Sequence, residues 1–292
     1  MINKITDGLK YWGQLLMLPV YWLSFLVPRD KKMWVFGSTF GRRFADNPKY
    51  LYLYTNQHEM DIRAIWISHN RDIVELLNRN GYEAYYYHSF KGICKCLRAG
   101  IYIFDNYSKD ISFWLSGGAV KFNLWHGSGN KKTNYDNKFD KVRHPKNNWE
   151  KFKTFPRRLS DEKPHHYTLA TSDIMADIFT SAFNTDLKHI IKDGYPRNDV
   201  LFEDEQIKNI ISDEEKRIIE QLEQRHKDKN KIIFYMPTFR ASESMFFDVV
   251  DLKKFNDFLK ENKFVFYTKL HPKSKLKDKF SEISYSNIID KN

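Results

Sequence analysis

The run MWVFG at residues 33–37 is short, apolar and closed by a glycine, and it predicts a buried strand. Outward from this run, further apolar segments alternate with segments of helical spacing. In the first half we predict strands at residues 62–68, 83–87, 101–104 and 120–125, and helices at residues 47–58, 71–80 and 90–98. Strands that alternate with helices indicate a parallel sheet with helices on both faces. The sequence therefore predicts an α/β fold.

The alternation resumes after residue 166. We predict strands at residues 167–171, 190–193, 231–236, 263–270 and 287–290, and helices at residues 173–183, 204–226 and 252–261. A length of 292 residues suggests two domains. The second has few strands before the sequence ends, so we expect it to be truncated. The expected division is an N-terminal amphipathic helix at residues 1–29, a first domain at residues 30–185 and a partial second domain at residues 186–292.

Lysine and arginine outnumber aspartate and glutamate by 48 to 37, which gives a formal net charge of +11. This balance favours anionic partners, namely phosphorylated substrates, an acidic lipid surface or nucleic acid. The sequence has no RNA- or DNA-binding signature, so we expect no nucleic-acid partner. Its two cysteines, Cys94 and Cys96, exclude a disulfide framework and lack the further Cys or His pair of a zinc site. They fit a reducing environment.

Residues 11–28 carry no charge and are rich in Leu, Tyr and Trp, with cations on both sides. The run is shorter than the about 20 apolar residues of a spanning helix, and it contains Gln14 and Pro19. It predicts a helix at a membrane interface, with aromatic rings at headgroup depth. The alternative is a helix packed on the protein's own core.

A basic segment at residues 129–158 interrupts the alternation, with ten Lys or Arg against three acidic residues. It predicts a long loop or a helical excursion, and segments of this length are commonly functional or mobile. Its cations are suited to hold an anionic polymer through many weak contacts. The alternative is a solvated segment whose charge serves solubility or attraction to lipid.

Polar clusters follow several predicted strands, where open α/β sheets bind their ligands. Gly37 and Ser38 follow the first strand, where a glycine lets backbone N–H groups approach a phosphate. His126 follows a later strand, beside a glycine and near Lys131 and Lys132. Its ordinary pKa near 6.5 suits proton transfer at neutral pH. The alternatives are a tight turn for the glycine and a structural role for the histidine.

Two further clusters follow predicted strands in the second half. Thr238 and Arg240 come after the strand KIIFYM, and arginine binds phosphate through its bidentate fork. Lys269 and His271 end the strand KFVFYTKL or follow it, so both clusters are placed to line one pocket. The sequence contains no D-x-D, H-E-x-x-H, Walker or G-x-S-x-G motif, so we expect neither a metal nor a cofactor.

These motifs resemble those of the CDP-glycerol:poly(glycerophosphate) glycerophosphotransferases, which build wall teichoic acids and phosphate-containing capsules. The resemblance rests on GSTFGRRFADNPKYLY, AIWIS, NLWHG, GYPRND, YMPTFR and KLHP in this order, and it covers the chain from Trp34 onward. It implies a glycosyltransferase type B fold of two Rossmann-like domains, often with a membrane-binding N-terminal helix. A D-Y-S-S-like segment of the family is absent from the sequence.

The resemblance also implies substrates and site residues. CDP-glycerol would be the donor and an anionic polymer the acceptor, at the cytoplasmic face of the membrane. His126 and His271 would be catalytic. The donor phosphates would meet Thr238, Arg240 and Lys269. The first domain would be the acceptor side, with contributions from Gly37, Ser38, Lys131 and Lys132.

The expected reaction is transfer of glycerol phosphate to a polymer hydroxyl, with His126 as the general base and release of CMP. Either histidine can instead simply bind phosphate. Fold does not fix the donor, so a CDP-ribitol or nucleotide-sugar transferase of the same fold is an alternative. An inactive, membrane-associated homologue is another.

Overall fold

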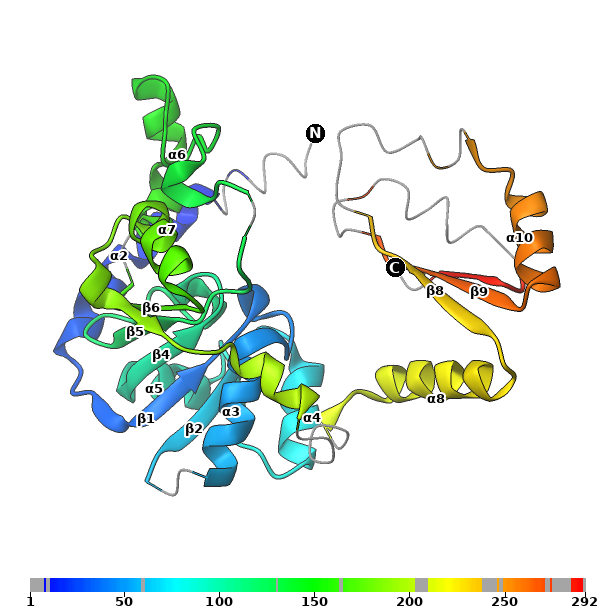
Figure 1. The fold of residues 1–292 in the computed structure, drawn as a ribbon. Coiled ribbons are helices and arrows are strands. Elements are labelled where there is room, and N and C mark those ends of the chain that lie inside the picture. Colours follow the sequence, from blue (N-terminus) through cyan, green and yellow to red (C-terminus); the bar gives the residue numbers. More distant parts are fainter. Residues whose placement is uncertain are drawn as a thin grey trace. The chain divides into compact units, whose positions relative to one another are not determined.

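The computed structural model describes residues 8, 11–58, 61–129, 131–162, 165–202, 210–237, 246, 249–270, 274 and 285–290. The chain divides into two compact units, Met1–Ile210 and Ile211–Asn292. Figure 1 shows the helices and strands of each unit.

The first unit is built on a seven-stranded sheet with the order β3-β2-β1-β4-β5-β6-β7. Its strands are all parallel, and they are β1 (Asp30–Phe36), β2 (Arg63–Ser68), β3 (Ala84–Tyr86), β4 (Ala99–Phe104), β5 (Val120–Asn123), β6 (Tyr167–Ala170) and β7 (Ile190–Lys192). The predicted α/β class and parallel sheet are therefore confirmed. The strand order reverses between β1 and β4, and open α/β sheets bind ligands at such a point.

Helices cover both faces of this sheet, with α3 and α4 on one face and α5 on the other. The helices of the unit are α2 (Leu18–Leu23), α3 (Asp46–His58), α4 (Arg71–Arg79), α5 (Phe90–Arg98), α6 (Asn148–Asp161) and α7 (Asp173–Phe183). Short 3₁₀ helices connect them: η1 (Gln14–Met17), η2 (Ser24–Leu26), η3 (Thr39–Gly41), η4 (Ser108–Asp110), η5 (Asn134–Asp136), η6 (Leu187–His189) and η7 (Pro196–Leu201).

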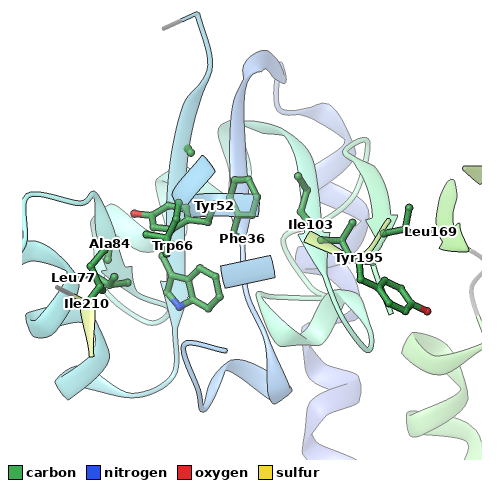
Figure 2. Packing of buried hydrophobic residues seen from close by; sticks show 12 residues of the cluster. Phe36, Tyr52, Trp66, Leu77, Ala84, Ile103, Leu169, Tyr195 and Ile210 are labelled. Carbon is green, nitrogen blue, oxygen red and sulfur yellow. The ribbon is translucent and has the colours of Figure 1, made fainter. Parts of the chain in front are cut away.

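Successive side chains of the central strands enter two different cores, because neighbouring residues of a strand point to opposite faces. Phe36 and Trp66 pack with residues of α3 and α4 in the first core, which Figure 2 shows. Val35 and Ile65 pack with residues of α5 in the second core. Both faces of the sheet are thereby buried, which leaves its strand ends free to carry polar groups.

The second unit has a smaller parallel sheet with the order β10-β9-β8. Its elements are α8 (Asp213–Lys227), β8 (Lys231–Tyr235), α10 (Leu252–Glu261), β9 (Phe264–Thr268) and β10 (Ile288–Asp290). Leu259, Phe266 and Ile288 form the buried centre of its core.

Three helices, α5, α7 and α10, begin and end at the predicted residues. The start predicted for the helix at residues 204–226 is wrong, because α8 begins only after Ser212. The Ser212 hydroxyl accepts a hydrogen bond from the Glu215 N–H (3.2 Å), and the Glu215 carboxylate accepts one from the Ser212 N–H (2.7 Å). This capping box fixes the helix start. Residues 203–209 lie outside the described part of the chain.

The two units divide at Ile210, later in the chain than the expected boundary at residue 186. The reason is that β7 pairs with β6 at the edge of the large sheet. Tyr195 and Ile210 also pack in the core of Phe36 and Trp66. These contacts keep the segment after β6 in the first unit.

The N-terminal segment is helical over residues 11–26 and has two contrasting sides. On one side Tyr21 is buried, and its ring stacks on Phe113 with the centroids 4.6 Å apart. The other side is apolar and exposed to solvent through Leu16, Trp22, Leu23 and Leu26. Within the described residues, none of the helices has both the length and the apolar character needed to cross a membrane.

The basic segment at residues 129–158 contains η5 and most of α6, so its second half is a helical excursion. Ion pairs attach this excursion to the rest of the first unit. The Asp161 carboxylate, fully buried, accepts hydrogen bonds from Lys109 Nζ (2.6 Å) and Arg157 Nε (2.9 Å). Arg143 is buried as well and donates to Asp140 (2.6 Å). Part of the cationic charge therefore serves to anchor the excursion.

Candidate active site

The carboxyl ends of β1, β4 and β5 lie side by side and carry polar groups. Ser38 follows β1 and Asp105 follows β4. The Ser38 hydroxyl donates to Asp105 Oδ2 (2.5 Å), and the Thr39 N–H donates to Asp105 Oδ1 (3.0 Å). Ser38 is fully buried, and a Cβ on Gly37 would come within 2.7 Å of the Asp110 carbonyl oxygen. Gly37 and Ser38 are thus packed against the segments that follow β4. Their predicted role on the acceptor side stays a prediction.

A second carboxylate, Asp110, holds the turn after β1. Thr39 and Phe40 both have positive φ (50° and 54°), a conformation that non-glycine residues adopt only when neighbouring contacts hold it. Asp110 Oδ1 accepts a hydrogen bond from the Phe40 N–H (2.9 Å), and Oδ2 accepts one from the Asn106 N–H (2.8 Å). Burial raises the pKa of Asp110 well above its ordinary value, and the nearby Asp105 carboxylate adds to the rise.

His126 follows β5 at this edge and its side chain is exposed. Its ring stacks on Trp125 (centroids 4.0 Å apart), which in turn packs against Phe183 of α7 (4.9 Å). Desolvation by the surrounding protein lowers the pKa of His126, while the carboxylates of Asp105 and Asp46 oppose this shift. A lowered pKa favours the neutral imidazole, which is the form that can accept a proton.

The backbone around His126 is held by residues from two distant segments. Asn47 Nδ2 donates to the Trp125 carbonyl (2.8 Å), and Arg197 Nη1 donates to the His126 carbonyl (2.9 Å). Arg197 Nη1 also donates to Asp46 Oδ1 (2.9 Å), and the Arg197 N–H donates to Asn47 Oδ1 (3.3 Å). Burial raises the pKa of Asp46, although the Arg197 guanidinium acts against this rise.

This clamp of Asp46, Asn47 and Arg197 fixes a strained backbone, since Trp125 has φ of 50° and Gly127 has φ of 149°. The sequence prediction did not include the three clamp residues in the site. The available signal was their position inside two of the family-like motifs, FADNP and GYPRND. Asp46 and Arg197, which form the ion pair, are 151 positions apart in the sequence, so only the tertiary fold brings them together.

The other predicted site residues belong to later parts of the chain. Lys131 and Lys132 are exposed in the segment between β5 and η5. Lys269 is exposed after β9 in the second unit, where its N–H donates to the Tyr235 carbonyl (3.0 Å). Thr238, Arg240 and His271 lie outside the described residues. Among the residues that the structure describes, no group of three His, Cys, Asp or Glu side chains is arranged to hold a metal ion.

Comparisons with known proteins show what the chain is similar to. The teichoic acid poly(glycerol phosphate) polymerase of Bacillus spizizenii is 28% identical over 235 residues, which cover 77% of this chain and 55% of that protein. The teichoic acid glycerol-phosphate transferase of Staphylococcus aureus is 26% identical over 220 residues, which cover 74% and 52%. The chain thus spans about half the length of these relatives.

A solved structure of the wall teichoic acid polymerase TagF, soaked with CDPG, has a similar fold. The TM-score is 0.65 at 21% sequence identity, and the match covers 99% of this chain and 70% of that chain. The family model described as CDP-Glycerol:Poly(glycerophosphate) glycerophosphotransferase matches residues 20–290. With nearly the whole chain matched, and with the NLWHG, FADNP and GYPRND motifs joined in one site, this chain belongs to the CDP-glycerol:poly(glycerophosphate) glycerophosphotransferase family.

Proposed function

We propose that this protein transfers glycerol phosphate from CDP-glycerol to a terminal hydroxyl of an anionic cell-surface polymer of the teichoic acid type, releasing CMP. The observation that carries the proposal is the clamped His126 at the carboxyl end of β5, which pairs with β4 at the strand-order reversal of the sheet. Family membership supplies the chemical class of the substrates.

In the proposed reaction the acceptor hydroxyl oxygen attacks the β-phosphorus of CDP-glycerol. A new P–O bond forms to the acceptor, and the P–O bond to the bridging oxygen breaks, so that CMP leaves with that oxygen. His126 takes the hydroxyl proton, and its lowered pKa favours the neutral form that can do so. The clamp contributes by fixing the histidine, because transfers of phosphoryl groups depend mainly on positioning and charge stabilisation.

The donor side of the proposal involves the second unit. There Lys269, Thr238, Arg240 and His271 would neutralise the diphosphate of CDP-glycerol, as the sequence motifs imply. The two units would then correspond to the two Rossmann-like domains of a glycosyltransferase type B enzyme, with the first unit on the acceptor side. The parallel sheet in each unit supports this assignment.

We also infer peripheral attachment to the cytoplasmic face of the membrane. The exposed apolar side chains of residues 11–26 continue onto α6, because Trp12 packs on Phe152 (centroids 4.8 Å apart) and the Tyr11 hydroxyl donates to the Lys153 carbonyl (2.8 Å). On α6 the rings of Trp149, Phe152 and Phe155 are exposed. Aromatic side chains interleaved with lysines suit the headgroup layer of an anionic membrane.

CMP release from CDP-glycerol in the presence of a glycerol phosphate primer tests the function. His126→Asn should lower kcat at least a hundredfold, since a positioned acid–base group contributes about 10² to 10⁴. His58→Asn is the matched control, because His58 is an exposed histidine of α3. Release of a different nucleotide, or release of CMP from CDP-ribitol but not from CDP-glycerol, would favour another transferase of the same fold. Unchanged turnover of His126→Asn would remove this histidine from the mechanism.

A further inference from the structure

We propose that Asp46 is a positioning residue for His126, and that its carboxylate stabilises the imidazolium that forms when His126 takes the acceptor's proton. The inference rests on the proposed function and deepens it, because it gives the base a counter-charge. Asp46 is the first residue of α3, which follows β1, and His126 follows β5. Both strands are neighbours of β4 in the sheet, so the carboxylate and the base come to the same edge.

One nitrogen of Arg197 connects the carboxylate to the base. Arg197 Nη1 donates to Asp46 Oδ1 (2.9 Å) and to the His126 carbonyl oxygen (2.9 Å). The carboxylate oxygen and this carbonyl oxygen are therefore no farther apart than twice that distance. The imidazole of His126 also interacts with its own backbone, and this contact acts to raise its pKa. The carboxylate and the base are thus gathered around one guanidinium.

The Asp46 carboxylate keeps one oxygen without a hydrogen bond. Oδ1 accepts from the Asn47 N–H (2.8 Å) as well as from Arg197, whereas Oδ2 accepts from none of the residues that the structure describes. The Asp46 side chain is 24% exposed. A carboxylate that is partly shielded from water acts on a neighbouring charge more strongly than a fully solvated one, because less solvent screens it. The guanidinium favours the charged form of Asp46.

The backbone at Asp46 is strained, with φ of 59°. Trp125, the residue before His126, has φ of 50°. Non-glycine residues adopt such a conformation only where the surroundings hold it, and these residues gather at functional sites. Asparagine and aspartate tolerate a positive φ better than most residues do. Asp46→Asn can therefore remove the charge while the backbone stays as it is.

The charges that face His126 show why it needs a neighbouring anion. Desolvation is the largest influence on His126 and disfavours the imidazolium, and the Arg197 cation acts in the same direction. The carboxylates of Asp105 and Asp46 act against both. Both oxygens of Asp105 already accept hydrogen bonds inside the sheet edge, and this residue is buried. Asp46 is the carboxylate of the two that is partly exposed and only half engaged.

The test has two readouts on the whole chain. The first is an NMR titration of the His126 imidazole in protein made with isotope-labelled histidine, and the spectrum of His126→Asn assigns the signal. The second is the pH dependence of kcat and of kcat/KM for CMP release. Asp46→Asn is the central variant, because the amide keeps an oxygen for the hydrogen bonds from Arg197 and Asn47.

Three further variants frame this comparison. Asp46→Gly is a second variant without the charge, and glycine suits the positive φ at this position. Arg197→Gln removes the cation that faces His126. Asp72→Asn removes an exposed aspartate from the first turn of α4 and is the matched control. Thermal melting of each variant shows that it is folded.

In Asp46→Asn and Asp46→Gly we expect the pKa of His126 to fall below its wild-type value, because an anion that favours the imidazolium is gone. The acid limb of kcat/KM should move to lower pH with it. The value of kcat should fall roughly tenfold or more, because the base is weaker and its charge is less stabilised. In Arg197→Gln the pKa should rise instead, and Asp72→Asn should match the wild type.

An Asp46 carboxylate that serves only to hold Arg197 would lower turnover without moving the pKa of His126. An unchanged or raised pKa of His126 in both Asp46 variants would therefore overturn the inference, and so would wild-type turnover of Asp46→Asn.

The two readouts separate this inference from the proposed function. A protein whose His126 pKa falls in Asp46→Asn but which releases no CMP would contradict the transferase activity and keep the pairing of Asp46 with His126. A protein that transfers glycerol phosphate, with the wild-type His126 pKa and acid limb retained in Asp46→Asn, would keep the activity and reject the role of Asp46.

Discussion

Arg197 donates a hydrogen bond from Nη1 to the carbonyl oxygen of His126, and the same nitrogen donates to the carboxylate of Asp46. The arginine follows β7 and the histidine follows β5, and the two residues are 71 positions apart in the sequence. One side chain therefore fixes the backbone of the proposed base to the first residue of α3. This contact joins sequence motifs that lie far apart in the chain, and the sequence alone does not show that they meet.

The clamp makes a prediction about Arg197→Lys. A lysine keeps the charge, but its nitrogen stands on a flexible stem and lacks the rigid planar guanidinium, so it should hold the two contacts of Nη1 less firmly. Loss of the fixed histidine backbone should lower kcat by about tenfold to a hundredfold, since small misplacements of a reacting group are costly. Steady-state CMP release measures the effect. Arg79→Lys on the surface of α4 serves as control, and an Arg197→Lys enzyme as fast as this control would show that the clamp does not position the base.

A second prediction concerns acid stability and His165. Removal from water, with the charges of Lys121 and Arg143 nearby, lowers the pKa of His165 to about 3. In the unfolded chain this histidine takes up a proton near pH 6.5, whereas in the folded chain it does not. The free energy of unfolding is therefore unaffected by His165 above pH 6.5 and decreases as the pH falls from 6.5 toward 3. The loss amounts to up to about 1.4 kcal/mol per pH unit from this group.

His165→Phe should therefore flatten the pH dependence of the free energy of unfolding between pH 6.5 and 4. The phenyl ring can keep the edge contacts that His165 makes with Phe104 and Phe183, whose centroids lie 5.2 and 5.8 Å away. Urea unfolding at several pH values measures the slope, with the exposed His58→Phe as control. An unchanged slope in His165→Phe would assign the acid sensitivity to other groups.

The anchor of the basic excursion gives a third prediction. Burial acts to raise the pKa of Asp161, but Lys109 and Arg157 outweigh it and the pKa is lowered. Asp161→Ala removes the shared carboxylate and its charge-assisted hydrogen bonds from Lys109 and Arg157, which should cost about 1.5–3 kcal/mol of unfolding free energy. Chemical denaturation measures this loss. Asp186→Ala breaks an exposed pair with Lys188 (3.2 Å) and should cost less than about 1 kcal/mol; equal losses would mean that Asp161 is no anchor.

The exposed rings of α6 give a fourth prediction. Replacing Trp149 and Phe152 together by Gln should weaken binding to anionic lipid vesicles at least tenfold, because each inserted aromatic ring contributes about 1.5–3 kcal/mol. Vesicle sedimentation measures the binding. Phe258→Gln on α10 is the control, with a ring that is similarly exposed, 50% against 55% for Phe152. Undiminished sedimentation of the double variant would place the membrane contact elsewhere on the protein.

Local sequence patterns were sufficient for most of the helices and strands. The apolar run at β1 and the later alternation predicted the parallel sheet, and α5, α7 and α10 were predicted to the residue. Such elements are set by side-chain periodicity and by caps such as Ser89, which accepts from the Gly92 N–H (3.0 Å). The position of His126 at a strand end was also predictable, because parallel strands carry their ligand-binding groups at their carboxyl ends.

Long-range contacts escaped prediction. The sequence contains Asp46, Asn47 and Arg197 in two separate motifs, and only the packing of η7 beside α3 brings them around His126. Periodicity and capping act over a few residues and are written in the local sequence, whereas the partners and the hydration of a polar side chain depend on which distant segments the folded chain places around it.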